Sequence, residues 1–282
     1  MSFKALKKAS EDTSILSSND VYNKASDCYE VFEVGKWQQG IIAAAVDKVA
    51  LESPIALVYN GVSHVVMMAT PHNLEQLALG FSLSEGIIDS VEQFYGVDTM
   101  ITSGGIELNI DINTEKFVKL KHWRRNQTGR TGCGLCGAES LQQAIRPVPP
   151  VPDVKHLDGK LLQTAILSLN EQQLLQKQTG ASHCAAWYDL QGKLQWLSED
   201  VGRHNALDKL IGTLYQQKIN LTEGIVLVSS RASYEMVTKS CQVGISRLAA
   251  VSAPTSLALN LAKTSGLRLV GFARPGRFTV YN

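Results

Sequence analysis

The sequence predicts an α/β protein: a mixed sheet with flanking helices, preceded by a smaller N-terminal lobe that is mostly β. In the second half of the chain, short apolar runs alternate with segments of helical periodicity, which favours right-handed βαβ units. The first half is richer in strand-like stretches. Between them lies "RPVPPVPD" (146–153), whose four prolines stiffen it as an extended connector.

This connector is either a domain linker or a rigid strap across one domain. We interpret it as a boundary. The expected organisation is a mobile N-terminal segment at 1–30, an N-terminal lobe at 31–145 that includes a cysteine-containing loop, and a C-terminal α/β lobe at 146–282.

In the N-terminal lobe, "IIAAAVDKVA" (41–50) and "PIALVYNGVSHVVMMAT" (54–70) predict strands. Asn60 and Gly61 form the strongest short hairpin signal in the second of these stretches. Residues 97–121 predict a meander of further strands, and 138–145 predict a helix.

Between the strands of this lobe, the segment from Thr70 to Ile87 predicts a helix. Thr70 is the expected N-cap and Pro71 the first-turn proline, because both residue types are favoured at those positions. Leucine, alanine and phenylalanine at 74, 77, 78 and 81 then share one helical face, which predicts its buried side.

The C-terminal lobe predicts a regular alternation of elements. They are, in order, a helix at about 168–179, a hairpin around "QGK" (191–193), a helix at 201–218, a strand at 224–228, a helix at 233–245, a strand at 247–251, a helix at 255–266, a strand at 267–272 and a short edge strand from 277.

Polar residues follow these strands where ligands of such sheets are usually bound. "SSRAS" (229–233) exposes backbone N–H groups and Arg231, which suits an anion; a plain N-cap by Ser233 is the alternative. "FARPGR" holds Arg274 and Arg277 around a proline–glycine turn, which suits phosphates or a flat ring; an ordinary surface turn is the alternative.

A further polar run, "EDVGRHNALDK" (199–209), opens a predicted helix. Arg203 and His204 suggest a binding edge, whereas a solvated helix start is the alternative. His204 and His183 could also steer protons, although a packed or capping histidine would look the same in the sequence.

Composition narrows the class of protein. The 282 residues are 44% hydrophobic and carry a formal net charge of +1, so a core is available and no basic field exists to hold nucleic acid. The N-terminus lacks the apolar stretch of a secretory signal, and the early apolar run is too short to span a bilayer. We expect a cytoplasmic protein with neither nucleic-acid nor membrane partners.

The most distinctive motif is "GRTGCGLCG" (129–137). Cys133 and Cys136 lie at the start of the predicted helix, where orphan N–H groups and the helix dipole lower a thiol pKa. An exposed nucleophilic thiolate fits this setting. Half of a zinc site, a redox dithiol and a deaminase-type zinc site are the alternatives. Each lacks expected companions, because no paired histidines or general acid/base glutamate accompany the motif, and we predict no permanently bound metal.

Six stretches in the same order resemble the formate dehydrogenase accessory sulfurtransferases, the FdhD family, over roughly residues 40–282. They are "ESPIALVYNG", "TPHNLEQLALGFSLSEGII", "RTGCGLCG", "EDVGRHNALDKLIG", "VSSRASYEMV" and "LVGFARPGRFTVYN". The resemblance implies a cytidine-deaminase-like fold, which agrees with a CxxC pair opening a helix, and a homodimer.

The same resemblance implies a function. Family members accept persulfide sulfur from a cysteine desulfurase and pass it to the molybdenum or tungsten bis(guanine dinucleotide) cofactor, which formate dehydrogenase then receives. Cys133 would carry the persulfide, supported by Cys136. The family's cofactor-binding stretch corresponds to Phe272, Ala273, Arg274, Pro275, Gly276 and Arg277.

Arg231 and Arg203 are candidate second contacts to the cofactor. A cofactor-binding chaperone without chemistry of its own, and a zinc enzyme of the deaminase type, are the alternative functions. The chaperone would need no thiol, and the zinc enzyme would bind a metal ion; a sulfur carrier needs the thiol and no metal ion.

Overall fold

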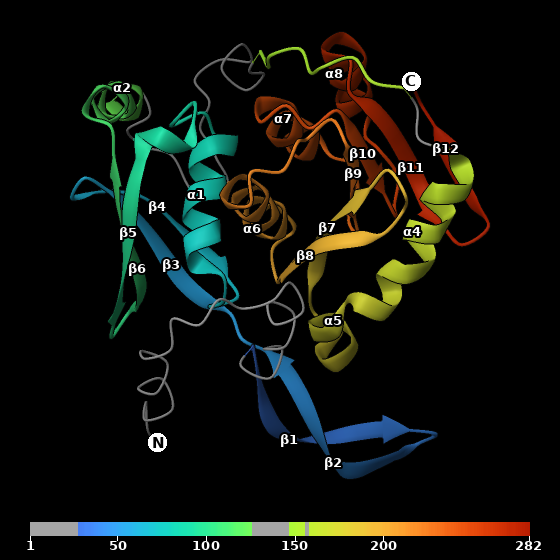
Figure 1. Ribbon diagram of the computed structural model, residues 1–282. Helices are drawn as coiled ribbons and strands as arrows, with labels where there is room; N and C mark the ends of the chain where they lie inside the picture. Colours follow the sequence, from blue (N-terminus) through green and yellow to red (C-terminus); the bar gives the residue numbers. More distant parts are fainter. Residues whose placement is uncertain (1–27, 126–146, 156–157) are drawn as a thin grey trace.

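A computed structural model describes residues 28–125, 147–155 and 158–282 (Figure 1). Its strands form three separate sheets: a two-stranded arm, a four-stranded sheet in the N-terminal lobe and a six-stranded sheet in the C-terminal lobe. The mixed α/β class and the smaller N-terminal lobe are therefore confirmed. The predicted helix at 138–145 and nearly all of the predicted mobile segment lie outside the described residues.

The four-stranded sheet has the order β4-β3-β6-β5. Its strands are β3 (Ser53–Tyr59), β4 (Val62–Ala69), β5 (Phe94–Thr102) and β6 (Gly105–Ile112). Strands β3 and β6 run parallel, and the other neighbours are antiparallel. The β3–β4 turn is confirmed, since Asn60 and Gly61 both have the positive φ that this tight turn requires.

Two helices and a short 3₁₀ turn complete this lobe: α1 (Leu74–Ser84), η4 (Val91–Gln93) and α2 (Thr114–Arg125). The strand meander predicted for 97–121 is wrong beyond Ile112. Asn113 Oδ1 there accepts the backbone N–H of Glu115 at 2.9 Å, an N-cap-type contact that opens α2.

The predicted start of α1 is also wrong. Thr70 is not its N-cap, because the helix begins at Leu74 after Asn73, whose φ is 53°. The Thr70 hydroxyl instead accepts the Val201 N–H at 3.2 Å, and the Thr70 N–H donates to Asp200 Oδ2 at 3.1 Å. Contacts to a segment 130 residues away thus override the local capping preference.

The six-stranded sheet has the order β12-β11-β10-β9-β7-β8. Its strands are β7 (His183–Asp189), β8 (Leu194–Asp200), β9 (Gly224–Val228), β10 (Arg247–Ala250), β11 (Arg268–Arg274) and β12 (Arg277–Val280). Strands β9, β10 and β11 are parallel, and β7, β8 and β12 join them in antiparallel pairs. The short edge strand at the chain end is confirmed.

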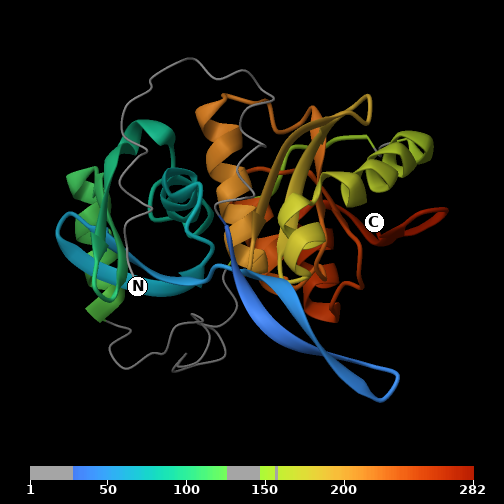
Figure 2. The same ribbon diagram turned by 90° about the horizontal axis from the view of Figure 1, so that it is seen from below.

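Helices cover both faces of this sheet (Figures 1 and 2). They are α4 (Gly159–Gln172), α5 (Leu174–Thr179), α6 (Arg203–Gln216), α7 (Tyr234–Gln242) and α8 (Ser256–Ser265). The single helix predicted at 168–179 is wrong, because α4 begins at Gly159, after the Asp158 carboxylate caps the Lys160 N–H at 2.9 Å.

Two hydrophobic clusters lie on opposite faces of the six-stranded sheet. One packs α4 against alternate residues such as Ala186, Leu227 and Ala249. The other packs α6, α7 and α8 against the intervening residues and continues into the N-terminal lobe through α1. The two sheets therefore share one continuous core.

The proline stretch lies along the C-terminal lobe. Val151 donates its N–H to Ser265 O at 2.9 Å, and Arg268 and Arg247 donate to the carbonyls of Val154 and Lys155 at 3.1 and 2.9 Å. These contacts hold the described part of the stretch as a strap on the lobe that it precedes.

Candidate functional site at one edge of the six-stranded sheet

Strand direction brings the predicted site residues to one edge of the sheet. Strands β9, β10 and β11 are parallel, while β7 is antiparallel to both β9 and β8. The carboxyl ends of β8, β9, β10 and β11 therefore share an edge with the start of β7. The polar segments predicted after β8, β9 and β11 therefore lie at the same edge, together with "SAPTS" (252–256) after β10.

Backbone hydrogen bonds connect these segments beyond the strands themselves. Ser252 donates to Ser230 O at 3.4 Å, Thr255 donates to Ala232 O at 3.1 Å, and Phe272 donates to Ser252 O at 3.1 Å. Ala232 and Pro254 also form an isolated parallel bridge. "SSRAS", "SAPTS" and the start of "FARPGR" thus form one continuous surface.

The β11–β12 hairpin presents both of its arginines to solvent. Arg274 and Arg277 are exposed and directly paired, and Gly276 between them has a φ of 79°, which favours glycine. Gln163 of α4 accepts the Gly276 N–H at 2.8 Å and donates to Arg274 O at 3.4 Å. Sequence reasoning missed Gln163, because this contact spans more than 110 residues.

A bulge precedes the hairpin, between Gly271 and Arg274. Phe272 there has a φ of 50°, rare for a bulky residue, and its side chain is 39% exposed, whereas Ala273 is buried in the core. The Arg274 Nε donates to Val251 O at 3.3 Å, which holds this guanidinium over the end of β10. Such backbone outliers are frequent at functional sites.

Arg203 and His204 converge on Glu235 at the starts of α6 and α7. His204 Nε2 lies 2.5 Å from Glu235 Oε2, and Arg203 Nη2 lies 3.6 Å from the same oxygen. The close contact with the His204 imidazole is the main cause that lowers the Glu235 carboxyl pKa. Glu235 was not among the predicted site residues; an acidic residue in the first helical turn was its only sequence signal.

His183 occupies the start of β7 opposite Asp200. Partial burial lowers the pKa of its imidazole, and the positive charges of Arg203 and His204 lower it further. The lowered pKa favours the neutral form of this imidazole, which can accept a proton.

Arg231 is exposed on the loop after β9. Ser233 holds the N-cap position of α7 but makes no side-chain capping bond, and its Oγ is buried without a hydrogen-bond partner within the described residues. The plain N-cap interpretation of this serine is therefore wrong. The Ser233 side chain thus makes no capping bond at the start of α7, where Arg231 is exposed nearby in the sequence.

Three acidic residues of "EDVGRHNALDK" have structural roles instead of forming a binding edge. Glu199 accepts the N–H groups of Leu175 and Gln176 at 2.7 and 2.9 Å and so caps α5. Asp200 and Asp208 are 0% and 1% exposed and pair with buried lysines. Of the polar residues in this run, Arg203 and His204 reach the candidate site.

The cysteines that the structure describes are poor nucleophiles. Cys28, Cys184 and Cys241 are buried and not disulfide-bonded. Burial raises the pKa of the Cys184 thiol to about 12 and that of the Cys241 thiol to about 11. Cys133 and Cys136 lie outside the described residues.

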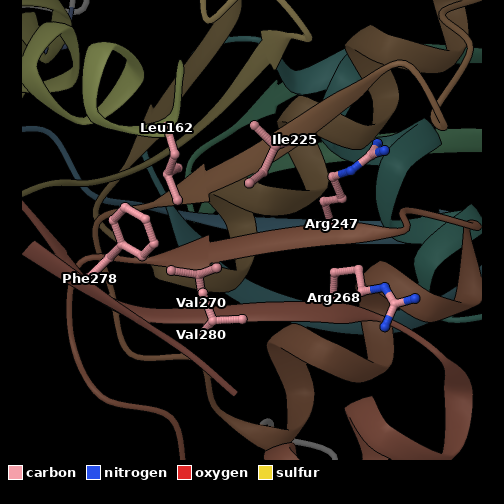
Figure 3. Close-up of a pocket in the computed structure, with 7 residues that line it drawn as sticks. All are labelled: Leu162, Ile225, Arg247, Arg268, Val270, Phe278 and Val280. Atoms are coloured by element: carbon pink, nitrogen blue, oxygen red, sulfur yellow. The ribbon is translucent and has the colours of Figure 1, made fainter. Parts of the chain in front are cut away.

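A small cavity opens at the opposite edge of the same sheet (Figure 3). Its volume is about 120 Å³ and its lining is mostly apolar. The guanidinium groups of Arg247 and Arg268 point away from Leu162 and Phe278 (Figure 3), and Arg247 donates to the carbonyls of Thr222 and Gly224 at 2.7 and 3.2 Å. Arg247 thus links the start of β10 to that of β9, and Arg268 donates to Val154 O at 3.1 Å. Both arginines lie apart from the candidate site.

Two other features bear on the class of protein. No group of three or more histidine, cysteine, aspartate or glutamate side chains in the described ranges is arranged to hold a metal ion. None of the described helices combines the length and apolar character that crossing a bilayer requires.

Fold and site together define a mixed α/β protein with an arginine-bearing edge at the strand ends of its larger sheet. The family model of the FdhD/NarQ family matches residues 50–282, and the chain belongs to this family. A relative from Cupriavidus necator H16, described as "Sulfur carrier protein FdhD", is 48% identical over 253 residues, which cover 90% of this chain and 88% of the relative.

A crystal structure of a protein from Desulfotalea psychrophila, described as a formate dehydrogenase accessory protein, has the same fold. Its TM-score is 0.69 at 24% identity, and the match covers 90% of this chain and 97% of that one. The family model and the relative from Cupriavidus necator confirm the family resemblance predicted from the sequence.

Proposed function

We propose that this protein is a sulfur carrier: it accepts persulfide sulfur from a cysteine desulfurase and transfers it to the molybdenum bis(guanine dinucleotide) cofactor that formate dehydrogenase requires. The observation that carries the proposal is the 48% identity, over nine tenths of the chain, to a protein described as a sulfur carrier. In this proposal the partners are the desulfurase, formate dehydrogenase and a second copy of the chain.

Cys133 is the proposed carrier. Its thiolate attacks the outer sulfur of the desulfurase persulfide; a new S–S bond forms on Cys133, and the desulfurase cysteine leaves as a thiolate. The pKa values of Cys184 and Cys241 are raised to about 12 and about 11, so few thiolates form at either position at neutral pH. This supports the CxxC pair as the place of transfer.

Cys136 is proposed to assist the second step. The carried atom is sulfane sulfur, so its delivery as sulfide needs two electrons. The Cys136 thiolate can supply them by attacking the Cys133 sulfur, which releases sulfide and closes a Cys133–Cys136 disulfide. A cellular dithiol reductant would then reopen that disulfide.

The arginine-bearing edge is the proposed cofactor site. Planar guanidinium groups form bidentate hydrogen bonds with phosphates and stack on flat rings. The guanine dinucleotide arms of the cofactor contain both phosphates and flat guanine rings. Arg274 and Arg277 are exposed there, Phe272 adds an exposed aromatic ring, and Arg231 stands on the adjoining loop. Arg203, engaged with Glu235, is a second contact that could exchange partners.

Persulfide mapping tests the proposal. The protein is incubated with a cysteine desulfurase and L-cysteine, and its tryptic peptides are analysed by mass spectrometry. We expect the peptide with Cys133 to gain one sulfur atom, and we expect Cys133→Ala to abolish the gain. Cys136→Ala should still load sulfur but fail to release it.

A non-catalytic chaperone for the cofactor is the competing function, since the same arginines would serve it. Restoration of formate dehydrogenase activity by Cys133→Ala, in a strain lacking this protein, would favour the chaperone over the carrier.

A further inference from the structure

A two-stranded arm projects from the body of the protein (Figures 1 and 2). Its strands, β1 (Tyr29–Gln38) and β2 (Ile41–Ala50), pair antiparallel over ten residues each and join neither of the other sheets. A ten-residue strand is roughly 33 Å long. Isolated two-stranded ribbons are marginally stable in water, so pairing with another strand would stabilise an arm of this length.

The two edges of the arm differ in charge. Strand β1 carries Glu30, Glu33 and Lys36, the kind of charged side chains that keep edge strands from pairing. The outer part of β2, residues 41–46, reads "IIAAAV" and has no charge. An uncharged, apolar edge strand invites strand pairing.

The side chains of outer β2 are also exposed. Ile42 and Val46 are 72% and 63% exposed and share one face with Trp37, which is paired with Ile42 across the arm and is 70% exposed. Ile41, on the opposite face, is 71% exposed. Burial of such side chains against a partner removes apolar surface from water, which favours association. Among the described residues, no strand pairs with the second edge of β2, and the apolar side chains of Trp37, Ile42 and Val46 are exposed on one face of the arm.

We infer that β2 pairs antiparallel with β2 of a second copy of this chain, so that the two arms form one four-stranded sheet. This inference deepens the dimer included in the proposed function, since it assigns the contact surface. The formal net charge of +1 leaves little repulsion between copies.

Symmetry fixes the form of the pairing. A twofold axis perpendicular to a sheet keeps each side chain on its own face, so one residue must lie opposite its own copy. Ala44 is the residue we assign, because Ile42 then lies opposite Val46 of the partner subunit, on the face that carries Trp37. In this register Asp47 lies opposite the partner's Ile41, so no two charges face each other.

Disulfide trapping tests the register. Residues directly opposite in an antiparallel pair have Cα atoms about 4.5–5.5 Å apart, within the range that a disulfide spans. Ala44→Cys should therefore form an intermolecular disulfide under mild oxidation, identified by mass spectrometry of the linked peptides. Glu33→Cys, on β1, is the matched control and should not link.

Charge insertion tests the interface itself. At position 44, a charge would face its own copy, so Ala44→Glu and Ala44→Lys should each weaken dimerisation at least tenfold in analytical ultracentrifugation. A mixture of the two variants should restore a dimer, as a heterodimer. Glu33→Lys, a larger charge change on the other edge, should dimerise as the wild type does.

The outcomes separate cleanly. The inference is overturned if the wild type is monomeric or if both charge variants dimerise as the wild type does. It is also overturned if Glu33→Cys cross-links as efficiently as Ala44→Cys, or if β2 binds the desulfurase and not a second copy. Sulfur loading of Cys133 is measured separately in the Ala44 variants, so the loss of the arm contact and the loss of sulfur carriage can be told apart.

Discussion

Gly80 of α1 and Gly212 of α6 meet where the two lobes join. A Cβ placed on Gly80 would lie 1.8 Å from Asp208 O and 2.8 Å from Gly212 N, and one placed on Gly212 would lie 2.0 Å from Gln76 O. The helices thus cross in direct backbone contact, which a side chain at either position would prevent. This crossing fixes how the N-terminal sheet stands relative to the sheet that carries the candidate site.

Substitution at this crossing should destabilise the fold. Gly212→Ala forces backbone atoms apart, and we expect a loss of about 3 kcal/mol or more in the free energy of unfolding. Urea denaturation followed by circular dichroism measures it. Gly104→Ala, where an added Cβ meets nothing within 4 Å, is the control and should stay within about 0.5 kcal/mol of the wild type. Equal stability of the two variants would contradict the close crossing.

The buried ion pair between Asp200 and Lys209 provides a second prediction. Their side chains lie 2.6 Å apart and are almost fully buried, and Lys209 also donates to Thr70 O at 2.9 Å. Asp200→Asn leaves the ammonium group without its counterion and should cost about 3–5 kcal/mol in denaturant unfolding.

The double variant Asp200→Asn with Lys209→Met provides the control for this pair. Because it removes the stranded charge, it should recover part of the lost stability. A double variant less stable than the sum of the two single effects would show that the pair acts through packing instead of charge.

Thiol reactivity should separate the cysteines. Because burial raises the thiol pKa of Cys184 to about 12 and of Cys241 to about 11, both should resist iodoacetamide in the native protein at pH 8. We expect Cys133 and Cys136 to be alkylated at least tenfold faster, as followed by mass spectrometry. Labelling in denaturant is the control, and all five cysteines should react there. Fast native labelling of Cys184 would contradict its burial.

Arginine variants should separate cofactor binding from sulfur loading. Arg274→Gln and Arg277→Gln each remove a charge-assisted contact and should weaken binding of the guanine dinucleotide cofactor roughly tenfold to a hundredfold. Arg268→Gln, at the opposite edge of the sheet, should leave that affinity unchanged. Equilibrium binding measurements decide this, and persulfide loading of Cys133 should be the same in all three variants.

His183 predicts a pH dependence of stability. Its pKa is lowered in the folded protein, so the unfolded chain binds the proton more tightly and stability falls as the pH drops below about 6.5. Glu235, whose pKa is also lowered, affects stability only at more acidic pH, below its ordinary value of 4.5. The stability advantage of the wild type over His183→Gln should therefore shrink between pH 7.5 and 5.5. If the stability difference between the wild type and His183→Gln grew on acidification, the His183 pKa would be raised in the folded protein and not lowered.

The sequence by itself determined the local elements and the chemical character of the site. Side-chain periodicity and turn chemistry act over a few residues. They predict the alternation of strands and helices in the C-terminal lobe, the Asn60–Gly61 turn and the polar segments after the strands. The six motifs identified the family for the same reason, since each is a contiguous run.

Only the tertiary structure decided which of these residues have structural roles. Thr70 was the expected helix cap, yet it binds Asp200 across 130 residues. Asp208 belongs to a polar run, yet it pairs with Lys239 at 2.9 Å inside the core. Glu235 and Gln163 joined the site through contacts between distant segments. A local pattern cannot specify such partners, because burial and charge pairing depend on which segments the whole fold brings together.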